Sequence, residues 1–319
     1  MKVSLTRLGF GAAPIGNLYR AISDEEARAA VDVAWDSGIG YFDTAPHYGL
    51  GLSERRLGAA LASRPRSDYV ISTKVGRILE PADGGGDDLA NGFAVPATQR
   101  RVWDFSADGV RRSLESSLER LGTDHVEMVY LHDPDDHWEQ ASGEGIPALV
   151  ELRDQGVIDA IGVGMNQWEL PARFVRECDI DVVMLAGRYT LLEQDALAEF
   201  LPLCSERDVA VVAAGVFNSG LLSRPVVPEN AKYNYDDAPP ELVDRARRIA
   251  AVCDQHGVTL PQVAIQFPLG HPSVACVVIG SRTAEQMQSN AEHFEAPIPA
   301  ALWTALQDEG LLPREVPVP

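Results

Sequence analysis

Four polar residues at the ends of apolar runs have the chemistry for proton transfer. The stretch YFDTAPHYG (41–49) supplies the carboxylate of Asp43 and the phenol of Tyr48, with an imidazole between them. Lys74 and His132 each end a later apolar run. An ammonium within about 4–6 Å of a phenol favours the phenolate and lowers the phenol's pKa from its usual value of about 10. This combination indicates a tyrosine general acid/base that acts on a carbonyl or a hydroxyl group.

The remaining groups have supporting roles in this interpretation. Asp43 pairs with Lys74, because an unpaired buried ammonium is costly, and His132 donates a hydrogen bond to the substrate oxygen. Taken singly, each residue has an ordinary alternative. Asp43 would make a loop bond, Lys74 would be solvated, and Tyr48 would pack with a wet hydroxyl. Their common position at strand ends favours the catalytic interpretation.

The chain alternates short apolar runs with longer amphipathic stretches. The short runs are apolar on successive residues, which is typical of parallel strands that are covered on both faces. Strands are expected at 8–11, 40–43, 69–74, 125–131, 158–163, 181–184, 209–213 and 275–279. Helices are expected at 27–37, 55–62, 107–121, 143–155, 168–177, 193–207, 240–256 and 283–293. Ser23 and Glu26 predict a capping box for the first helix, and Ser53-Glu54 and Ser106 are expected to open the next two.

Eight strands that alternate with eight helices predict an α/β fold, a (β/α)8 TIM barrel with long loops over its C-terminal face. A doubly wound sheet is the alternative, but it requires a Gly-x-Gly-x-x-Gly turn, and the glycines at 9–16 lack that spacing. Residues 1–319 are expected to form a single barrel domain. Segments 76–105 and 217–239 are too long for tight connections and are expected to carry specificity. The proline-containing tail, 311–319, is expected to be an extended strap.

The composition limits the classes of partner. The 319 residues include 47 acidic and 27 basic side chains, a formal charge of −20, which is opposite in sign to that of a nucleic-acid binder. No stretch approaches the roughly 18 apolar residues of a membrane helix, and the N-terminus lacks the pattern of a signal peptide. We therefore expect a cytoplasmic enzyme that acts on a neutral small molecule, without nucleic acid or membrane. The sequence leaves the oligomeric state open.

The segment HDPDDH (132–137) is dense in ionisable groups, which suggests a metal site as an alternative. Such a site requires further ligands at other strand ends, and Lys74 within the cluster would repel a cation. We therefore expect no metal. The proline and the aspartates of this segment, including Asp133, instead predict a turn.

The chain resembles the aldo-keto reductase superfamily over nearly its whole length. The segment GYFDTAPHYG (40–49) is similar to the family's Asp-and-Tyr motif, Ser72-Thr73-Lys74 to its lysine strand, and Leu131-His132 to its histidine strand. The resemblance implies a catalytic tetrad of Asp43, Tyr48, Lys74 and His132. It also implies a nicotinamide cofactor, which supplies the hydride chemistry that side chains lack.

The same resemblance implies the residues that hold the cofactor. Asn166 matches the asparagine that binds the nicotinamide amide. Ala214 stands where a ring-stacking aromatic residue is common. Either Tyr189 or Phe217 makes that contact instead, or the ring is held more loosely. The pyrophosphate would lie against the loop after the seventh strand, and the adenosine end against the start of the last helix. The complete implied set is Gly11, Asn166, Phe217, Asn218, Ser219, Gly220, Leu221, Gly280, Ser281, Arg282, Gln286 and Asn290.

The residues at the adenosine end bear on the choice between NAD and NADP. A 2′-phosphate is a dianion that favours a bidentate arginine with further cations nearby. Arg282 is the one arginine of the implied set, and Gly280 and Gln286 occupy positions that are often basic in NADP-specific relatives. An exposed surface residue without a ligand is the alternative for Arg282. We therefore expect the use of both NAD and NADP.

Within the superfamily, three segments resemble the bacterial branch of L-fucose dehydrogenase, also called D-threo-aldose 1-dehydrogenase, which is near pyridoxal 4-dehydrogenase. These segments are HDPDDH (132–137), GVGMN (162–166) and VFNSG (216–220). The resemblance implies oxidation of the C1 hemiacetal of a free aldose to the lactone, with Tyr48 as general acid/base.

The substrate pocket is the least defined part of the site. Trp103 and Trp138 are candidates to line it by stacking on a sugar face, and ordinary packing is the alternative for both. The alternative functions are a broad aldehyde or ketone reductase, a pyridoxal 4-dehydrogenase, and a redox-sensing regulatory subunit that binds the cofactor. The first two would use the same tetrad.

Overall fold

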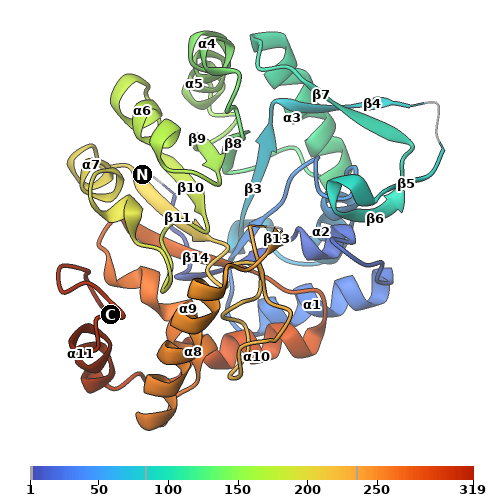
Figure 1. The fold of residues 1–319 in the computed structure, drawn as a ribbon. Coiled ribbons are helices and arrows are strands. Elements are labelled where there is room, and N and C mark those ends of the chain that lie inside the picture. Colours follow the sequence, from blue (N-terminus) through green and yellow to red (C-terminus); the bar gives the residue numbers. More distant parts are fainter. Residues whose placement is uncertain (1–2, 83–84, 235) are drawn as a thin grey trace.

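The computed structural model describes residues 3–82, 85–234 and 236–319, and a closed barrel of eight parallel strands lies at its centre (Figure 1). The barrel strands are β1 (Leu8–Gly11), β2 (Tyr41–Asp43), β3 (Val70–Val75), β8 (Met128–His132), β9 (Ala160–Met165), β10 (Val182–Ala186), β11 (Ala210–Ala214) and β14 (Val274–Gly280). The barrel closes where β1 pairs with β14, with Leu8 opposite Val277. The predicted (β/α)8 barrel is confirmed.

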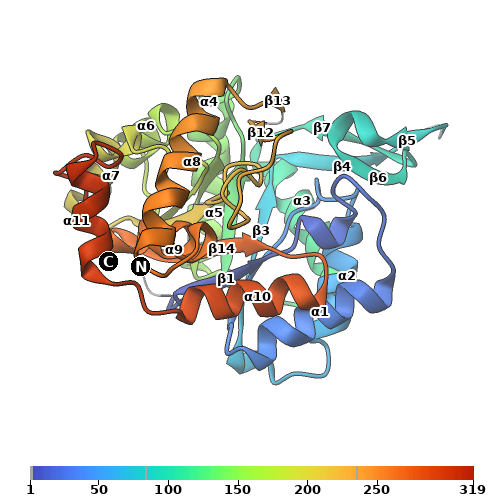
Figure 2. The same ribbon diagram turned by 60° about the horizontal axis from the view of Figure 1, so that its bottom comes forward.

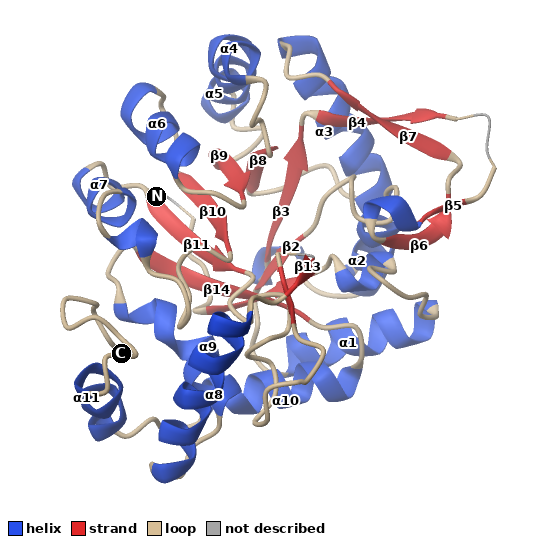
Figure 3. Cartoon of the chain, in the orientation of Figure 1, coloured by secondary structure: helices blue, strands red, loops and turns tan. Residues whose placement is uncertain are grey.

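Helices surround the barrel (Figure 3). They are α1 (Asp24–Asp36), α2 (Leu52–Leu61), α3 (Ala107–Leu121), α4 (Trp138–Gln140), α5 (Ile146–Asp154), α6 (Glu169–Glu177), α7 (Phe200–Glu206), α8 (Pro240–Gln255), α9 (Leu260–Gln266), α10 (Ala284–Glu295) and α11 (Ala300–Asp308). The predicted capping box of α1 is present, since Ser23 Oγ accepts from the Glu26 backbone N–H at 3.1 Å. The sequence does not predict α9 or α11. The apolar sequence of α9 is short, and periodicity does not separate such a run from a strand.

The start of α2 differs from the prediction. Its N-cap is Gly51, with φ of 80° and no side-chain cap. Ser53 Oγ instead donates to a backbone carbonyl just after β1, at 2.7 Å. Buried Glu54 accepts from Thr73 Oγ1 in β3 at 2.8 Å. These two side chains therefore join α2 to the barrel rather than cap the helix.

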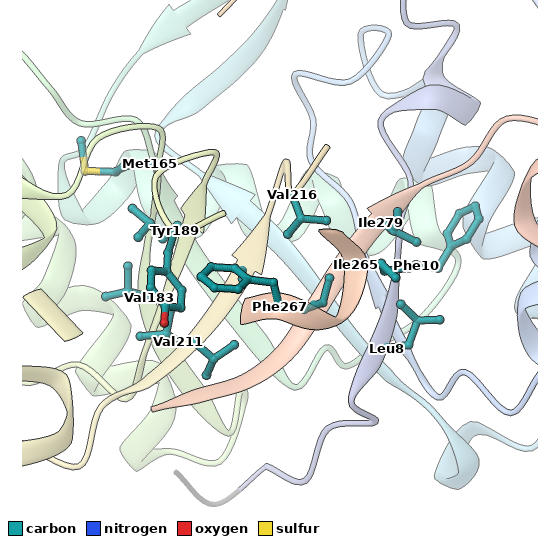
Figure 4. Packing of buried hydrophobic residues seen from close by; sticks show 14 of the residues in the cluster. Leu8, Phe10, Met165, Val183, Tyr189, Val211, Val216, Ile265, Phe267 and Ile279 are labelled. Atoms are coloured by element: carbon teal, nitrogen blue, oxygen red, sulfur yellow. The ribbon is translucent and has the colours of Figure 1, made fainter. Parts of the chain in front are cut away.

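Buried side chains fill the space both outside and inside the barrel. Figure 4 shows part of the outer layer, where strand residues such as Val183 and Val211 belong to the same hydrophobic cluster as Phe267. Inside the barrel, Tyr41 OH lies 3.2 Å from Tyr130 OH, among apolar side chains of the strands. The interior is therefore a packed core that closes the floor of the barrel's C-terminal end.

The two long segments form small hairpins. The first contains β4 (Arg77–Pro81) paired with β7 (Gln99–Trp103), and β5 (Asp87–Asp88) paired with β6 (Phe93–Pro96). The second contains β12 (Lys232–Tyr233) and β13 (Asp236–Asp237). Figure 2 shows both at the same end of the barrel, which is the C-terminal end because they follow β3 and β11. The tail has no helix or strand, as predicted. Within the described ranges, no helix is long and apolar enough to cross a membrane.

Gly162 of β9 marks a close approach of two barrel strands. A Cβ atom at this position would lie 1.7 Å from the Val182 carbonyl oxygen of β10, so the strands would have to move apart. We expect Gly162→Ala to lower the free energy of unfolding by about 1–3 kcal/mol, as measured by denaturant titration. Gly143→Ala is the control, because a Cβ there has no neighbour within 4 Å. Equal stability of the two variants would contradict this strand packing.

Candidate functional site

The register of the barrel brings three polar strand ends together. β2 pairs with β3, with Asp43 opposite Ser72, and β3 pairs in turn with β8. Tyr48 lies on the loop after β2, and His132 is the last residue of β8. All four residues of the predicted tetrad are at the C-terminal end of the barrel, and Tyr48, Lys74 and His132 line one cavity.

Lys74 and Asp43 form a buried ion pair below this cavity. Lys74 Nζ donates to Asp43 Oδ2 at 2.6 Å and to the Thr44 carbonyl at 3.0 Å, and the charged side chains are only 2% and 3% exposed. Ser72 Oγ donates to the other carboxylate oxygen at 2.7 Å. Burial acts to lower the pKa of Lys74, but the carboxylate of Asp43 outweighs it, so this pKa is raised and the ammonium stays charged.

The Tyr48 phenol lies beside this ammonium. Lys74 Nζ is 4.7 Å from the centroid of the Tyr48 ring. Burial raises the pKa of Tyr48, and this effect is larger than the opposing effect of Lys74. The sequence predicts a lowered pKa, and this prediction is wrong for the protein without ligand, because burial disfavours the phenolate. The protonated phenol can donate to a carbonyl oxygen, and it must first lose its proton before it can act as a base.

Two imidazoles lie close to the phenol. The His132 ring centroid is 5.8 Å from that of Tyr48, and the His47 ring centroid is 5.5 Å from that of His132. Burial and the nearby Arg77 lower the pKa of His132 well below its ordinary value. Burial and neighbouring cations lower the pKa of His47 to about 2. Both rings are therefore neutral at physiological pH, and each has one N–H to donate.

The cavity has a volume of about 640 Å³. Its polar lining includes His47, Tyr48, Lys74, Arg77, Asn91, His132, Asp133 and Asn166. Arg77 pairs with Asp133 in this lining, and the Arg77 guanidinium lies 4.3 Å from the Trp103 ring centroid. The charges of the lining are thus largely paired. In the part of the chain that the structure describes, no group of three or more His, Cys, Asp or Glu side chains could hold a metal ion.

The two candidate tryptophans have different surroundings. Trp103 is 43% exposed and lines an outer cavity of about 280 Å³, which shares Arg77, Asp133 and Asn166 with the main one. Trp138 lines neither cavity. It packs against Phe174 of α6, with ring centroids 4.7 Å apart. Trp138 therefore has an ordinary packing role, which was the alternative to lining the substrate pocket.

A groove of about 410 Å³ continues from the main cavity, and Asn166 lines both. Five of the predicted cofactor residues line this groove together with Asn166: Phe217, Asn218, Ser219, Gly220 and Gly280. Its lining also includes Arg188, which the sequence did not identify. The side-chain oxygen of Asn218 and Nε of Arg282 are buried without a protein partner among the described residues. Glycines that allow close approach and polar atoms without partners suit a long phosphate-containing cofactor.

The remaining predicted cofactor residues are not part of the described lining of this groove. Leu221 is fully buried, and Gly11 packs against Val278. At the expected adenosine end, Asn290 Nδ2 donates to Ser281 Oγ at 3.0 Å, and the Arg282 backbone N–H donates to Gln286 Oε1 at 3.1 Å.

Arg282 is not isolated from other cations. Burial lowers its pKa, and the nearby positive charge of Arg20 acts in the same direction. The sequence predicts Arg282 as the one arginine of the adenosine end, whereas the structure adds Arg20 from the loop after β1.

Comparison with known proteins agrees with this arrangement. The model of the Aldo/keto reductase family matches residues 7–308. The chain belongs to this family. It is 49% identical over 315 residues to a D-threo-aldose 1-dehydrogenase of Pseudomonas sp, and the aligned region covers 98% of this chain and 96% of the relative. It is 42% identical over 328 residues to a pyridoxal 4-dehydrogenase of Microbacterium luteolum, and the aligned region covers 97% of this chain and 95% of that relative.

A solved structure shows the same fold. The holo form of an aldo-keto reductase of Bacillus halodurans is similar with a TM-score of 0.74 at 28% identity, over 95% of this chain and 92% of the other. The protein is therefore an NAD(P)-dependent oxidoreductase with a nicotinamide cofactor, as the sequence predicted.

The two aromatic candidates of this aldo/keto reductase for the nicotinamide contact have different surroundings. Tyr189 is buried against Phe267, with ring centroids 5.4 Å apart (Figure 4). Phe217 lines the groove. Of these two residues, Phe217 belongs to the described lining of the groove and Tyr189 does not.

Sequence reasoning missed several residues of the reductase cavity. His47 was visible as the imidazole of the 41–49 motif, but nothing in the sequence indicated its environment. Asp133 was expected only in a turn, whereas it has φ of 44° and pairs with Arg77 in the cavity. Arg101 comes from the long segment 76–105, and its contacts with His47 and Asp88 depend on how that segment folds.

The lowered pKa of His47 predicts a pH-dependent contribution to stability. The unfolded chain binds a proton at this imidazole near pH 6.5, whereas the folded protein does so only near pH 2. Stability from neutral His47 is therefore complete above the ordinary pKa and is lost as the pH falls below it. Relative to His47→Gln, the wild type should lose up to about 1.4 kcal/mol per pH unit below about pH 6. Denaturant unfolding of both proteins at several pH values measures this difference, and parallel pH profiles would contradict the shift.

Proposed function

We propose that this aldo/keto reductase oxidises the C1 hemiacetal of a free aldose, such as L-fucose, to the lactone. The observation that carries the proposal is the Tyr48 phenol beside the Lys74–Asp43 pair, in a polar cavity that Asn166 joins to the cofactor groove. The 49% identity to a D-threo-aldose 1-dehydrogenase supports the substrate class.

In this proposal each tetrad residue has one task. Tyr48, as phenolate, accepts the proton of the C1 hydroxyl while C1 becomes the lactone carbonyl carbon. NAD(P)+ in the groove supplies the hydride acceptor. Lys74 stabilises the phenolate, and Asp43 keeps the ammonium in place. His132, which is neutral, donates a hydrogen bond to the same substrate oxygen. Because burial raises the pKa of Tyr48, the phenol is protonated and must lose its proton before it can act as the base in oxidation. In the reverse reaction, the same proton is donated to the carbonyl oxygen.

The electrostatics of the cavity support a neutral substrate. Lys74 pairs with Asp43 and Arg77 with Asp133, and both imidazoles are neutral. No cation is left over to attract a substrate carboxylate or phosphate through the described cavity lining. Trp103, which is 43% exposed and lines the outer cavity, is the candidate to contact the sugar.

The proposal includes the use of both NAD and NADP. Arg282 would contact a 2′-phosphate, and Arg20 adds a second positive charge nearby. A second candidate for the substrate is pyridoxal, because the chain is 42% identical to a pyridoxal 4-dehydrogenase.

A substrate panel tests the proposed function. L-Fucose, other free aldoses and pyridoxal are each incubated with NAD+ or NADP+, and the absorbance of the reduced nicotinamide is followed. We expect turnover of at least one aldose with both cofactors. Turnover of pyridoxal alone would establish the second candidate. The absence of turnover with every substrate of the panel, together with aldehyde-dependent oxidation of NADPH, would establish a broad reductase instead.

Tyr48→Phe tests the proposed proton transfer. We expect turnover to fall by on the order of 10²–10⁴, because the general acid/base is lost, while NADPH binding measured by protein fluorescence is retained. Tyr69→Phe is the matched control, since Tyr69 lies outside the barrel against Trp35 and Phe42. Undiminished turnover of Tyr48→Phe would show that another group handles the proton.

A further inference from the structure

His47 is a neutral imidazole whose tautomer is fixed by a neighbouring arginine. Arg101 Nε donates to His47 Nδ1 at 2.5 Å, and Arg101 Nη2 donates to the His47 carbonyl at 2.9 Å. A guanidinium has no acceptor, so Nδ1 must carry the lone pair and Nε2 the proton. His47 can therefore donate through Nε2 but cannot accept there.

Arg101 is itself held in one orientation. Its Nη1 and Nη2 donate to the two oxygens of Asp88 at 2.8 and 2.6 Å, and the side chains are only 11% and 5% exposed. Phe93 packs edge-on against His47, with ring centroids 5.2 Å apart. Asp88, Phe93 and Arg101 all belong to the long segment 76–105. This segment therefore sets the orientation of an imidazole that belongs to the loop after β2.

The fixed imidazole lies beside the groups that would react with substrate. Its ring centroid is 6.0 Å from that of Tyr48 and 5.5 Å from that of His132, and it lines the same cavity. No described residue accepts a hydrogen bond from Nε2, and this atom is not among those sealed inside the protein without a partner. His47 Nε2 is thus a donor beyond the tetrad that has no acceptor among the described residues. Such a donor, in the same cavity as Tyr48 and His132, is separate from the groups that would contact the reacting oxygen and is free to bind a second substrate oxygen.

We propose that His47 is a specificity-determining residue that donates from Nε2 to a hydroxyl oxygen on the carbon next to the reacting one. Arg101, held by Asp88, is the positioning residue that acts through it. This assignment deepens the proposed function, in which the neighbouring hydroxyl is that of C2 of the aldose. It also applies to any α-hydroxy aldehyde that the reductase accepts in the reverse direction.

The physical basis is the cost of leaving a partly buried donor unpaired. A substrate without the neighbouring hydroxyl displaces water from Nε2 and offers no acceptor in return, so it is disfavoured. Since Arg101 occupies Nδ1, the ring cannot turn its lone pair toward the substrate. The selection is therefore for a hydrogen-bond acceptor.

Matched substrate pairs test the assignment. One pair is L-fucose and 2-deoxy-L-fucose in the oxidation direction, and the other is glycolaldehyde and acetaldehyde in the reduction direction. The quantity measured is the ratio of kcat/KM for the hydroxylated substrate to that for its partner. This ratio is independent of the fraction of active enzyme, so partial unfolding of a variant does not affect it. We expect His47→Phe to lower the ratio about five- to tenfold, and His47→Gln, which retains a donor, to restore part of it.

A double-mutant comparison tests the positioning role of Arg101. Arg101→Met is combined with Asp88→Asn, so that no buried carboxylate is left unpaired. We expect this double variant to have a lower kcat/KM ratio than the wild type. Adding His47→Phe to it should lower the ratio no further, because Arg101 acts through His47. The control is Arg100→Ala, the neighbour on β7 that pairs with Glu80 at the surface and is 67% exposed. It should leave the ratio unchanged.

The outcomes separate this assignment from the proposed function. If no aldose is oxidised, the aldose proposal fails, and the glycolaldehyde pair still decides the role of His47. An unchanged ratio in His47→Phe overturns the assignment, even if aldoses are oxidised. A fall in Arg100→Ala equal to that in the Arg101 variant would overturn the positioning role.

Discussion

The site is built around an ammonium buried at the end of a barrel strand. Lys74 is 2% exposed, and a lone charge there would be strongly destabilising. Asp43 on the neighbouring strand neutralises it, and Ser72 and the Thr44 carbonyl complete the hydrogen bonds of the pair. The strand register makes this arrangement available, because it places Asp43, the last residue of β2, opposite Ser72, two residues before Lys74 on β3. The environment of Tyr48 follows from the same pair.

Charge pairing extends from this ion pair to the rest of the cavity. Arg77 has Asp133 as its partner, and Arg101 has Asp88. Burial, with a further contribution from the surrounding cations, lowers the pKa values of His47 and His132 and keeps both rings neutral. The cavity therefore offers hydrogen-bond donors whose net charge is small. Such a lining matches a polar, uncharged ligand, although the protein as a whole carries a formal charge of −20.

The sequence predicts the barrel and the position of the tetrad for one physical reason. Parallel strands are apolar along their length, so a polar residue that ends such a run stands out, and all strands end at the same face. The contacts of His47 and Asp133 have no such signal, because their partners are 54 and 56 residues away in a hairpin outside the barrel. Local pattern also leaves the packing of Trp138 against Phe174 undetermined. The pKa of Tyr48 depends on the balance of burial and charge, which only the folded protein shows.

The two long insertions serve different halves of the site. Segment 76–105 forms one wall of the main cavity, whereas residues 217–220 and Asn234 of the second segment line the groove, and Asn166 of the barrel lies between the two spaces. Changes in one insertion therefore need not disturb the space built by the other. In evolutionary terms, the barrel separates the choice of substrate from the choice of nicotinamide cofactor, so each can be exchanged while the proton-transfer centre is inherited intact.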